Sequence, residues 1–314
     1  MSAKSRVLFN KRKARNRFSI RAKATSDLRL TVFRSNTNFY CQIINDQKGV
    51  TLLSVSSLDK NLKKEIKKNA GNKIAAEIVG LRYVEVSTSA EDFDLDVERI
   101  IEVVEAISPS LIFLASPNNP TGKAVKRIDL ERICRSSKGL VVLDEAYWRF
   151  SQRSFVSLVE SFENLLVLQT LSKVGFAGLR VGMLYGPKPW VDLIDKIRMP
   201  YNINSLSQAG AMFVLSQEKL IFKNIQEVIR EREWMLDQLS SIKNLKVWPS
   251  EANFVLVRPT RKSGTEVFSK LKSKGFLVKD LSGSHPELID CLRITVGNHK
   301  ENTGFIEALT ALCG

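Results

Sequence analysis

Apolar segments of strand length alternate with helical patterns through the middle of the chain, and this alternation constrains the fold more than any other feature. Four segments read as buried strands: 110–115, 139–143, 165–168 and 181–185. The segment 126–136, between the first two, has helical spacing. Strands that alternate with helices predict an α/β domain whose mostly parallel sheet is covered on both faces.

Other segments extend this pattern in both directions. We expect a short strand at 81–86, a helix at 91–107, helices around 204–242, strands near 245–257 and 290–296, and helices at 264–274 and 300–312.

Polar motifs follow the first two strands of the predicted sheet. SPNNPTG (116–122) comes directly after the first strand; taken alone, it reads as a turn. DEAY (144–147) follows the second strand, where Asp144 leaves a buried apolar segment. Because a carboxylate is costly to bury without a cation, Asp144 suits a protonated ring nitrogen. The alternative for Asp144 is a helix cap.

The third motif, TLSKVGFAGLR (170–180), places a lysine, hydroxyls, glycines and an arginine within eleven residues. Lys173, near polar and cationic groups, can lose its proton and form an imine. Arg180 can bind a phosphate with two hydrogen bonds. The alternative is a basic loop between two strands. Since open α/β sheets bind ligands at the carboxyl ends of their strands, we expect the three motifs to form one site.

These motifs resemble those of fold-type-I pyridoxal-phosphate (PLP) aminotransferases. TLSKVGFAGLRVG looks most like the histidinol-phosphate aminotransferase family, and VVLDEAYWRF, SEANFVLVR (250–258) and LRITVG (292–297) support that choice. The resemblance covers residues 81–314. It implies a fold-type-I PLP-dependent transferase with a small C-terminal α+β domain, and amino transfer between histidinol phosphate and 2-oxoglutarate in histidine biosynthesis.

The resemblance also implies a role for each site residue. Lys173 would carry PLP covalently and move the proton during transfer, and Asp144 would pair with the pyridine nitrogen. The remaining contacts would come from Asn119 and Tyr147 to the phenolic oxygen, from Ser172, Arg180 and, more weakly, Thr170 to the phosphate, and from Arg293 to the anionic group of the substrate. Members of the family work as dimers, so a homodimer is a further expectation.

The first eighty residues differ sharply in charge from the rest. They hold 18 of the 48 Lys and Arg and 5 of the 33 Asp and Glu, so most of the net charge of +15 lies there. Residues 4–24 are a basic arm with too few apolar side chains to form a core. Strands are expected at 28–33, 39–44 and 50–55, followed by a lysine-rich helix from Leu58. This charge density suits a nucleic-acid backbone or, as the alternative, a solvated tail or membrane surface.

The segments RLTVFRSNTNFYCQIIND and GVTLLSVSSLD resemble bacterial large-subunit ribosomal protein eighteen, a 5S rRNA-binding family, over residues 4–80. That resemblance implies contact with 5S rRNA through residues 4–40. We therefore divide the chain into a basic arm (1–24), a meander with a helix (25–80), a partial PLP-binding large domain (81–240) and a small domain (241–314).

An intact aminotransferase of this family has a long N-terminal portion that residues 1–80 do not resemble. It carries sheet strands and part of the cofactor site, so we expect weak PLP binding and unpaired sheet edges. Three interpretations remain: an impaired enzyme with an N-terminal extension, an rRNA-binding fragment with an inert passenger, or two incomplete reading frames joined near Gly80.

The remaining composition limits other functions. The four cysteines show no paired spacing and the chain has two histidines, so we expect no metal site and unpaired thiols in a reducing cytoplasm. No segment approaches about 20 apolar residues, so we expect no membrane span.

Overall fold

The computed structural model describes six stretches of the chain: residues 28–34, 39–45, 50–56, 82–89, 91–198 and 202–314. The chain divides into two units, residues 1–85 and 86–314. Among the described residues, no helix is both long and apolar enough to cross a membrane.

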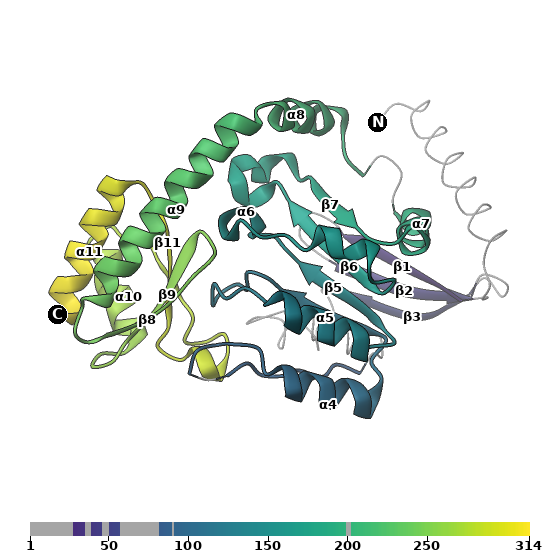
Figure 1. The fold of residues 1–314 in the computed structure, drawn as a ribbon, viewed down its shortest axis with the longest axis horizontal. Coiled ribbons are helices and arrows are strands. Elements are labelled where there is room, and N and C mark those ends of the chain that lie inside the picture. Colours follow the sequence, from purple (N-terminus) through teal and green to yellow (C-terminus); the bar gives the residue numbers. More distant parts are fainter. Residues whose placement is uncertain (1–27, 35–38, 46–49, 57–81, 90, 199–201) are drawn as a thin grey trace. The chain divides into compact units, whose positions relative to one another are not determined.

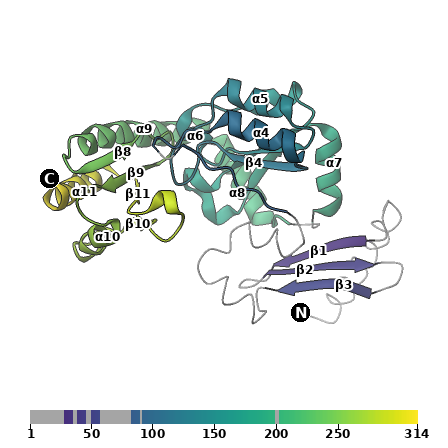
Figure 2. The same cartoon turned by 90° about the horizontal axis from the view of Figure 1, so that it is seen from below.

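The first unit contains an antiparallel three-stranded meander. Its strands β1 (Leu28–Arg34), β2 (Phe39–Asn45) and β3 (Val50–Ser56) are hydrogen-bonded in that order (Figure 2). The register between β2 and β3 shifts at Ile43 and Ile44. The three predicted strands are confirmed. The basic arm and the helix predicted after Leu58 lie outside the described residues.

The larger unit is built on a four-stranded mixed sheet in the order β4-β5-β6-β7 (Figure 1). Strands β4 (Leu111–Ala115), β5 (Leu140–Asp144) and β6 (Leu165–Thr170) are parallel, and β7 (Gly182–Tyr185) runs antiparallel to β6. All four predicted strands are present, and the mixed, mostly parallel sheet is the expected one.

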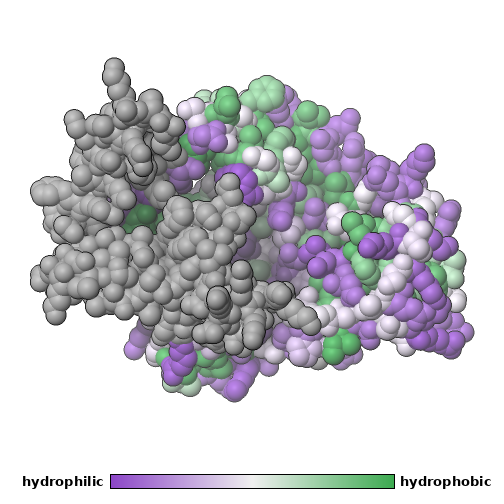
Figure 3. Space-filling model, turned by 180° about the vertical axis from the view of Figure 1, so that it is seen from behind, coloured by the Kyte–Doolittle hydropathy of each residue, from purple (hydrophilic) through white to green (hydrophobic). Residues whose placement is uncertain are grey.

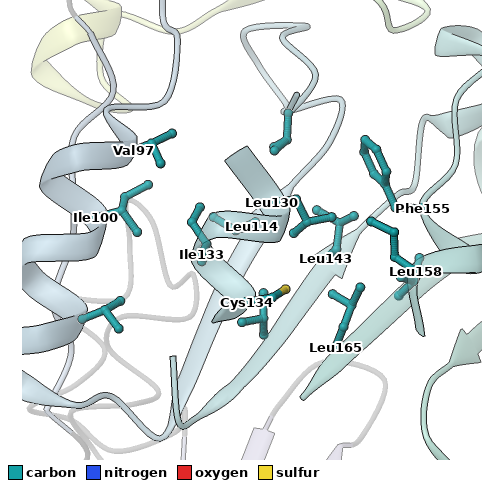
Figure 4. Close-up of a cluster of buried hydrophobic side chains, with 14 residues drawn as sticks. Val97, Ile100, Leu114, Leu130, Ile133, Cys134, Leu143, Phe155, Leu158 and Leu165 are labelled. Carbon is teal, nitrogen blue, oxygen red and sulfur yellow. The ribbon is translucent and has the colours of Figure 1, made fainter. Parts of the chain in front are cut away.

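Two helices, α4 (Val97–Ile107) and α5 (Arg127–Ser136), cover one face of this sheet. Their apolar side chains recur every three or four residues, and they pack on alternate residues of the strands, as periodicities of 3.6 and 2 require. Figure 4 shows this core: Val97 and Ile100 from α4, Leu130, Ile133 and Cys134 from α5, and Leu114, Leu143 and Leu165 from the sheet.

Two predictions for residues 81–107 are wrong. Residues 82–86 of the strand predicted at 81–86 are not in a strand, because no neighbouring strand in the described part of the chain bonds to them. The helix predicted at 91–107 starts only at Val97. Asp96 is the N-cap residue of this helix, because its side chain accepts a 3.0 Å hydrogen bond from the N–H of Arg99. Before it, Phe93 has a positive φ of 60°, which is not a helical conformation.

The helical pattern at 204–242 forms two helices, α8 (Ser205–Ser216) and α9 (Glu218–Ser240), and the structure adds two helices that were not predicted, α6 (Trp148–Ser151) and α7 (Lys188–Ile197). Helix α9 runs from α8 to the small domain (Figure 1). Its first half packs with Tyr147, whereas Met235 and Leu239 belong to the small-domain core. One helix therefore links the two domains.

The small domain contains an antiparallel sheet in the order β10-β11-β9-β8. Its strands are β8 (Leu245–Trp248), β9 (Phe254–Pro259), β10 (Lys279–Asp280) and β11 (Leu292–Thr295). The end of α9 packs with α10 (Gly264–Ser273) and α11 (His299–Cys313) on one face of this sheet (Figure 2). This arrangement is the expected small α+β domain.

Candidate active site

Asp144 lies at the carboxyl end of β5, beside the end of β6. In the parallel ladder Asp144 pairs with Leu168, and Leu168 comes two residues before Thr170, the last residue of β6. Because Val141 and Leu143 point into the core beneath α4 and α5, alternation places Asp144 and Thr170 on the opposite face of the sheet. Two of the predicted site residues therefore lie on the same face, at adjacent strand ends.

The loop that carries Lys173 starts where β6 ends. Ser172–Phe176 forms a π-helical turn, and Gly175 has a φ of +101°, a conformation that favours glycine. The backbone N–H of Ser172 donates to Thr170 Oγ1 at 3.0 Å, and the Thr170 hydroxyl donates to Ser172 Oγ at 2.9 Å. The loop therefore fixes two hydroxyls beside the end of the strand, while the Lys173 side chain is exposed.

A row of contacts joins the predicted residues of the large domain to those of the small domain. Lys173 Nζ lies 5.3 Å from the centre of the Tyr147 ring, which packs edge-on against Phe254 at 5.2 Å. The Arg293 guanidinium lies 5.2 Å from the Phe254 ring, and its Nη1 donates to Asn119 Oδ1. Four predicted site residues thus belong to one contiguous cluster, held together by Phe254.

The charged groups of this region are not neutralised by one another. Within the described part of the chain, no ion pair involves Asp144, Lys173 or Arg180, all of which are exposed. Asp144 Oδ1 accepts a 2.9 Å hydrogen bond from the N–H of Ala146, whereas the buried Nε of Arg293 has no partner. The unpaired Asp144 carboxylate, the Lys173 side chain and the Arg180 guanidinium fit a ligand that has a basic ring nitrogen, a carbonyl and an anionic group.

Arg180 is not brought into this cluster. It has a φ of +57°, and its N–H donates to the Ala177 carbonyl at 3.3 Å. Among the described residues, no hydrogen bond or ion pair joins its guanidinium to Ser172 or Lys173. A Cβ built at Gly175 or Gly178 would meet no described atom within 4 Å. The surface of this loop is therefore open to a ligand.

Several residues that support the site were not singled out from the sequence. Phe254 lies in SEANFVLVR and bridges Tyr147 and Arg293. Gly122 has a φ of +76°, and a Cβ there would lie 2.3 Å from Ser250 Oγ. The glycine of NPTG is therefore needed where the large and small domains touch. The buried pair Glu145 and Gln169 lies behind the strand ends. In the sequence, the position of Glu145 directly after Asp144 is the feature that could have indicated its place beside the site.

Comparisons with known proteins match two family models to the chain, and the two matches overlap at residues 72–101. The family model "Aminotransferase class I and II" matches residues 72–309, and "Ribosomal L18 of archaea, bacteria, mitoch. and chloroplast" matches residues 3–101. Histidinol-phosphate aminotransferase 2 of Nitrosococcus oceani is 40% identical over 236 residues, which cover 75% of this chain and 65% of the relative. Histidinol-phosphate aminotransferase of Chromobacterium violaceum is 41% identical, covering 76% and 66%. The chain thus spans slightly less than two thirds of the length of these relatives.

Solved structures show the same fold. The histidinol-phosphate aminotransferase of Clostridium acetobutylicum superposes with a TM-score of 0.72 at 23% identity, covering 78% of this chain and 75% of that structure. The enzyme of Sinorhizobium meliloti, solved in complex with pyridoxal-5′-phosphate, gives 0.68 at 23% identity, covering 78% and 68%. The fold-type-I architecture expected for the larger unit is confirmed.

Proposed function

Because the chain belongs to the class I and II aminotransferase family over residues 72–309, we propose that it catalyses PLP-dependent amino transfer from histidinol phosphate to 2-oxoglutarate. The observation that carries this proposal is the set of unpaired groups at the strand ends, with Lys173 Nζ held over the Tyr147 ring and Asp144 at the end of the adjoining strand. Relatives at 40% and 41% identity bear the name histidinol-phosphate aminotransferase, which supports a role in histidine biosynthesis.

The residues present fit PLP. Bound PLP supplies a protonated ring that withdraws electrons from the bonds of the substrate's α carbon. Asp144, which forms no ion pair with a described residue, would accept a hydrogen bond from the ring nitrogen. Asn119 and Tyr147 would bind the phenolic oxygen. Ser172 would bind the phosphate, with Thr170 as a weaker partner, and the Arg180 guanidinium, which lies outside the cluster of contacts, would be its second phosphate ligand.

Lys173 and Arg293 act on the substrate side. Lys173 Nζ would hold the cofactor covalently and, once released as an amine, would move the proton at the α carbon of the substrate. Arg293 binds the anionic group of the substrate, a carboxylate in glutamate or a phosphate in histidinol phosphate. Its unpartnered buried Nε and its contact with Asn119 support this role.

The full chain, incubated with PLP and reduced with borohydride, tests the proposal. We expect mass spectrometry to find a pyridoxyl adduct on Lys173, which is lost in Lys173→Ala and kept in the control Lys196→Ala on α7. Amino transfer from histidinol phosphate to 2-oxoglutarate should disappear with the adduct. An adduct spread over many surface lysines would contradict a site at Lys173.

A homodimer is the proposed assembly. Large apolar side chains are exposed on α8 and the start of α9: Leu206, Met212, Phe213, Leu215, Leu220 and Phe222. Hydrophobic surface gathers along this edge (Figure 3), and Gly210 of α8 packs on Leu179, next to Arg180. A patch of this kind marks a contact surface. Phe213, 67% exposed, offers the test: Phe213→Asp should shift the mass measured by light scattering from dimer to monomer.

A second candidate function is binding to 5S rRNA, favoured by the ribosomal L18 match over residues 3–101. Residues 4–40 provide the basic contacts. We expect affinity for 5S rRNA that falls with rising salt and is abolished when residues 1–24 are removed. Equal affinity for an unrelated RNA of the same length would contradict this function.

We propose that the basic arm, the meander with its helix, the large domain and the small domain meet at residues 24, 80 and 240. The proposed location of the protein is the cytoplasm. The three described cysteines, Cys134, Cys291 and Cys313, are buried free thiols, which suits a reducing compartment.

A further inference from the structure

Glu145 is a buried carboxyl group that has no role in the proposed chemistry. Its residue is 1% exposed, and no ion pair of the described residues includes it. It accepts three hydrogen bonds: from the Ser154 hydroxyl at 2.7 Å, from the N–H of Phe155 at 2.6 Å and from Gln169 Nε2 at 2.8 Å. Burying a carboxyl group is costly unless its oxygens accept hydrogen bonds, and these three bonds meet that requirement for Glu145.

The network joins three separate segments. Glu145 follows β5, Gln169 belongs to β6, and residues 154 and 155 follow α6. Gln169 Nε2 also donates to Ser154 Oγ at 3.0 Å, and the N–H of Glu145 donates to the Leu168 carbonyl at 2.8 Å. The ends of β5 and β6 are therefore linked both by backbone and by a closed set of side-chain bonds.

This network lies directly behind the candidate site. Side chains alternate along a strand, so Gln169 points to the same face of the sheet as Leu165 and Val167, which lie in the core. Thr170 points to the opposite face. Glu145 immediately follows Asp144, and Gln169 immediately precedes Thr170, whose hydroxyl is bonded to Ser172. The Glu145–Gln169 bond, together with the backbone ladder that pairs Asp144 with Leu168, therefore restrains the distance between the Asp144 carboxylate and the hydroxyls at the start of the Lys173 loop.

We propose that Glu145 is a positioning residue that holds Asp144 and the Thr170–Ser172 hydroxyls at the separation required by a rigid phosphorylated ring. The inference rests on the proposed function, because it assumes that both ends bind one PLP molecule. A rigid ligand tolerates little error, and a displacement of about 1 Å can cost about 100-fold in function. Glu145 touches neither cofactor nor substrate and acts only through its neighbours.

Glu145→Gln in the full chain tests the inference, with Glu231→Gln as the matched control. Glu231 accepts a 2.9 Å hydrogen bond from Asn302 Nδ2 in the small domain, so the control also breaks a carboxylate–amide pair, but away from the site. We expect Glu145→Gln to weaken PLP binding about tenfold or more and to move the pH midpoint of the bound-cofactor absorbance. The control should do neither at a comparable loss of thermal stability.

A rescue variant and a cofactor-free measurement complete the test. Glu145→Gln combined with Gln169→Glu restores a carboxylate–amide pair in the reverse order and should recover most of the PLP affinity. In the cofactor-free protein, Glu145→Gln should increase deuterium uptake in residues 170–180, as should Gln169→Met, which serves if the first variant fails to fold. Unchanged uptake there would overturn the inference even if the wild-type chain bound no PLP, an outcome that would itself contradict the proposed function. PLP affinity equal to that of the control variant would overturn it as well.

Discussion

The surroundings of Asp144 are those that a partner for a cationic ring needs. The side chain lies at the end of a buried strand, one of its oxygens accepts a backbone N–H, and no described basic group neutralises it. In an ordinary helix cap the acceptor bonds to the N–H groups of a following helix. The helix that follows, α6, has Tyr147 as its N-cap residue and no side-chain cap bond. Asp144 is therefore available to a ligand.

Asp144→Asn tests this assignment. The substitution keeps the shape of the side chain and removes its charge, so one hydrogen bond to a charged group is lost. Such bonds contribute about 1.5–3 kcal/mol, and we expect PLP affinity or the rate of amino transfer to fall roughly 10- to 100-fold. Asp192→Asn on α7 is the control, since Asp192 forms an exposed ion pair with Lys188. Equal effects of the two substitutions would argue against the role of Asp144.

A second prediction at the residue scale concerns Cys134. Burial, together with the nearby Glu131, raises the pKa of the Cys134 thiol to about 12. The thiol should resist iodoacetamide in the native protein at pH 8 and react once the protein is unfolded, as peptide mass spectrometry can show. Because the folded pKa is raised, its contribution to stability is complete below the unfolded pKa of about 8.5 and is lost as the pH rises toward 12. Native labelling at the rate of the unfolded chain would contradict this.

At the scale of elements, helix α9 connects the domains through Arg232. This side chain is 7% exposed, and its Nη1 donates to the carbonyls of Phe150 in α6 and Ala252 in the loop before β9, at 3.2 and 3.0 Å. A second bridge joins Arg153 to Glu251. The small domain, which supplies Phe254 and Arg293 to the candidate site, is therefore fixed to the large domain by the buried hydrogen bonds of Arg232, by a more exposed ion pair and by apolar packing.

Arg232→Met should lower the free energy of unfolding. Two buried carbonyls lose their donor, and leaving a buried polar group unsatisfied costs about 1–3 kcal/mol. The control Arg230→Met removes an exposed arginine of the same helix and should change the free energy by no more than about 0.5 kcal/mol. Urea unfolding followed by circular dichroism measures both. If Arg232→Met lowers the free energy of unfolding by no more than Arg230→Met does, the apolar contacts alone hold the domains together.

At the scale of the whole molecule, the sheet of the larger unit is open at an edge. β4 bonds to β5 and to no other described strand, and on one side its Leu111 and Phe113 are 46% and 64% exposed. An apolar edge without charge or proline is an acceptor for another strand. The relatives contain about a third of their length with no match here, and the resemblance places that third ahead of residue 81.

A polypeptide comprising that missing third of a relative should therefore complement the full chain. Added in trans, it should raise PLP affinity and the yield of the Lys173 adduct, because we expect it to pair with the β4 edge and to supply cofactor contacts. Phe113→Lys, which places a charge on the exposed edge, should abolish the effect, as titration of the PLP absorbance can show. A chain that binds PLP equally well with and without the added segment would contradict this prediction.

The sequence alone determined the strands of the large sheet and the polar residues that follow them. Apolar runs bounded by turn residues predict buried strands, and at the end of a parallel strand the next residues point to the binding edge. It also separated the basic N-terminal segment from the rest, because charge and composition are local properties. Asp144, Lys173 and their motifs could be found in this way.

Only the tertiary structure decided the features that depend on distant partners. Residues 82–86 are not a strand, since a strand exists only where a neighbour completes its hydrogen bonds. Phe254 joins Tyr147 to Arg293, and Glu145 joins β5 to β6, through contacts between residues far apart in the chain. Such contacts arise from the packing of whole elements, and local patterns of hydrophobicity carry no record of them.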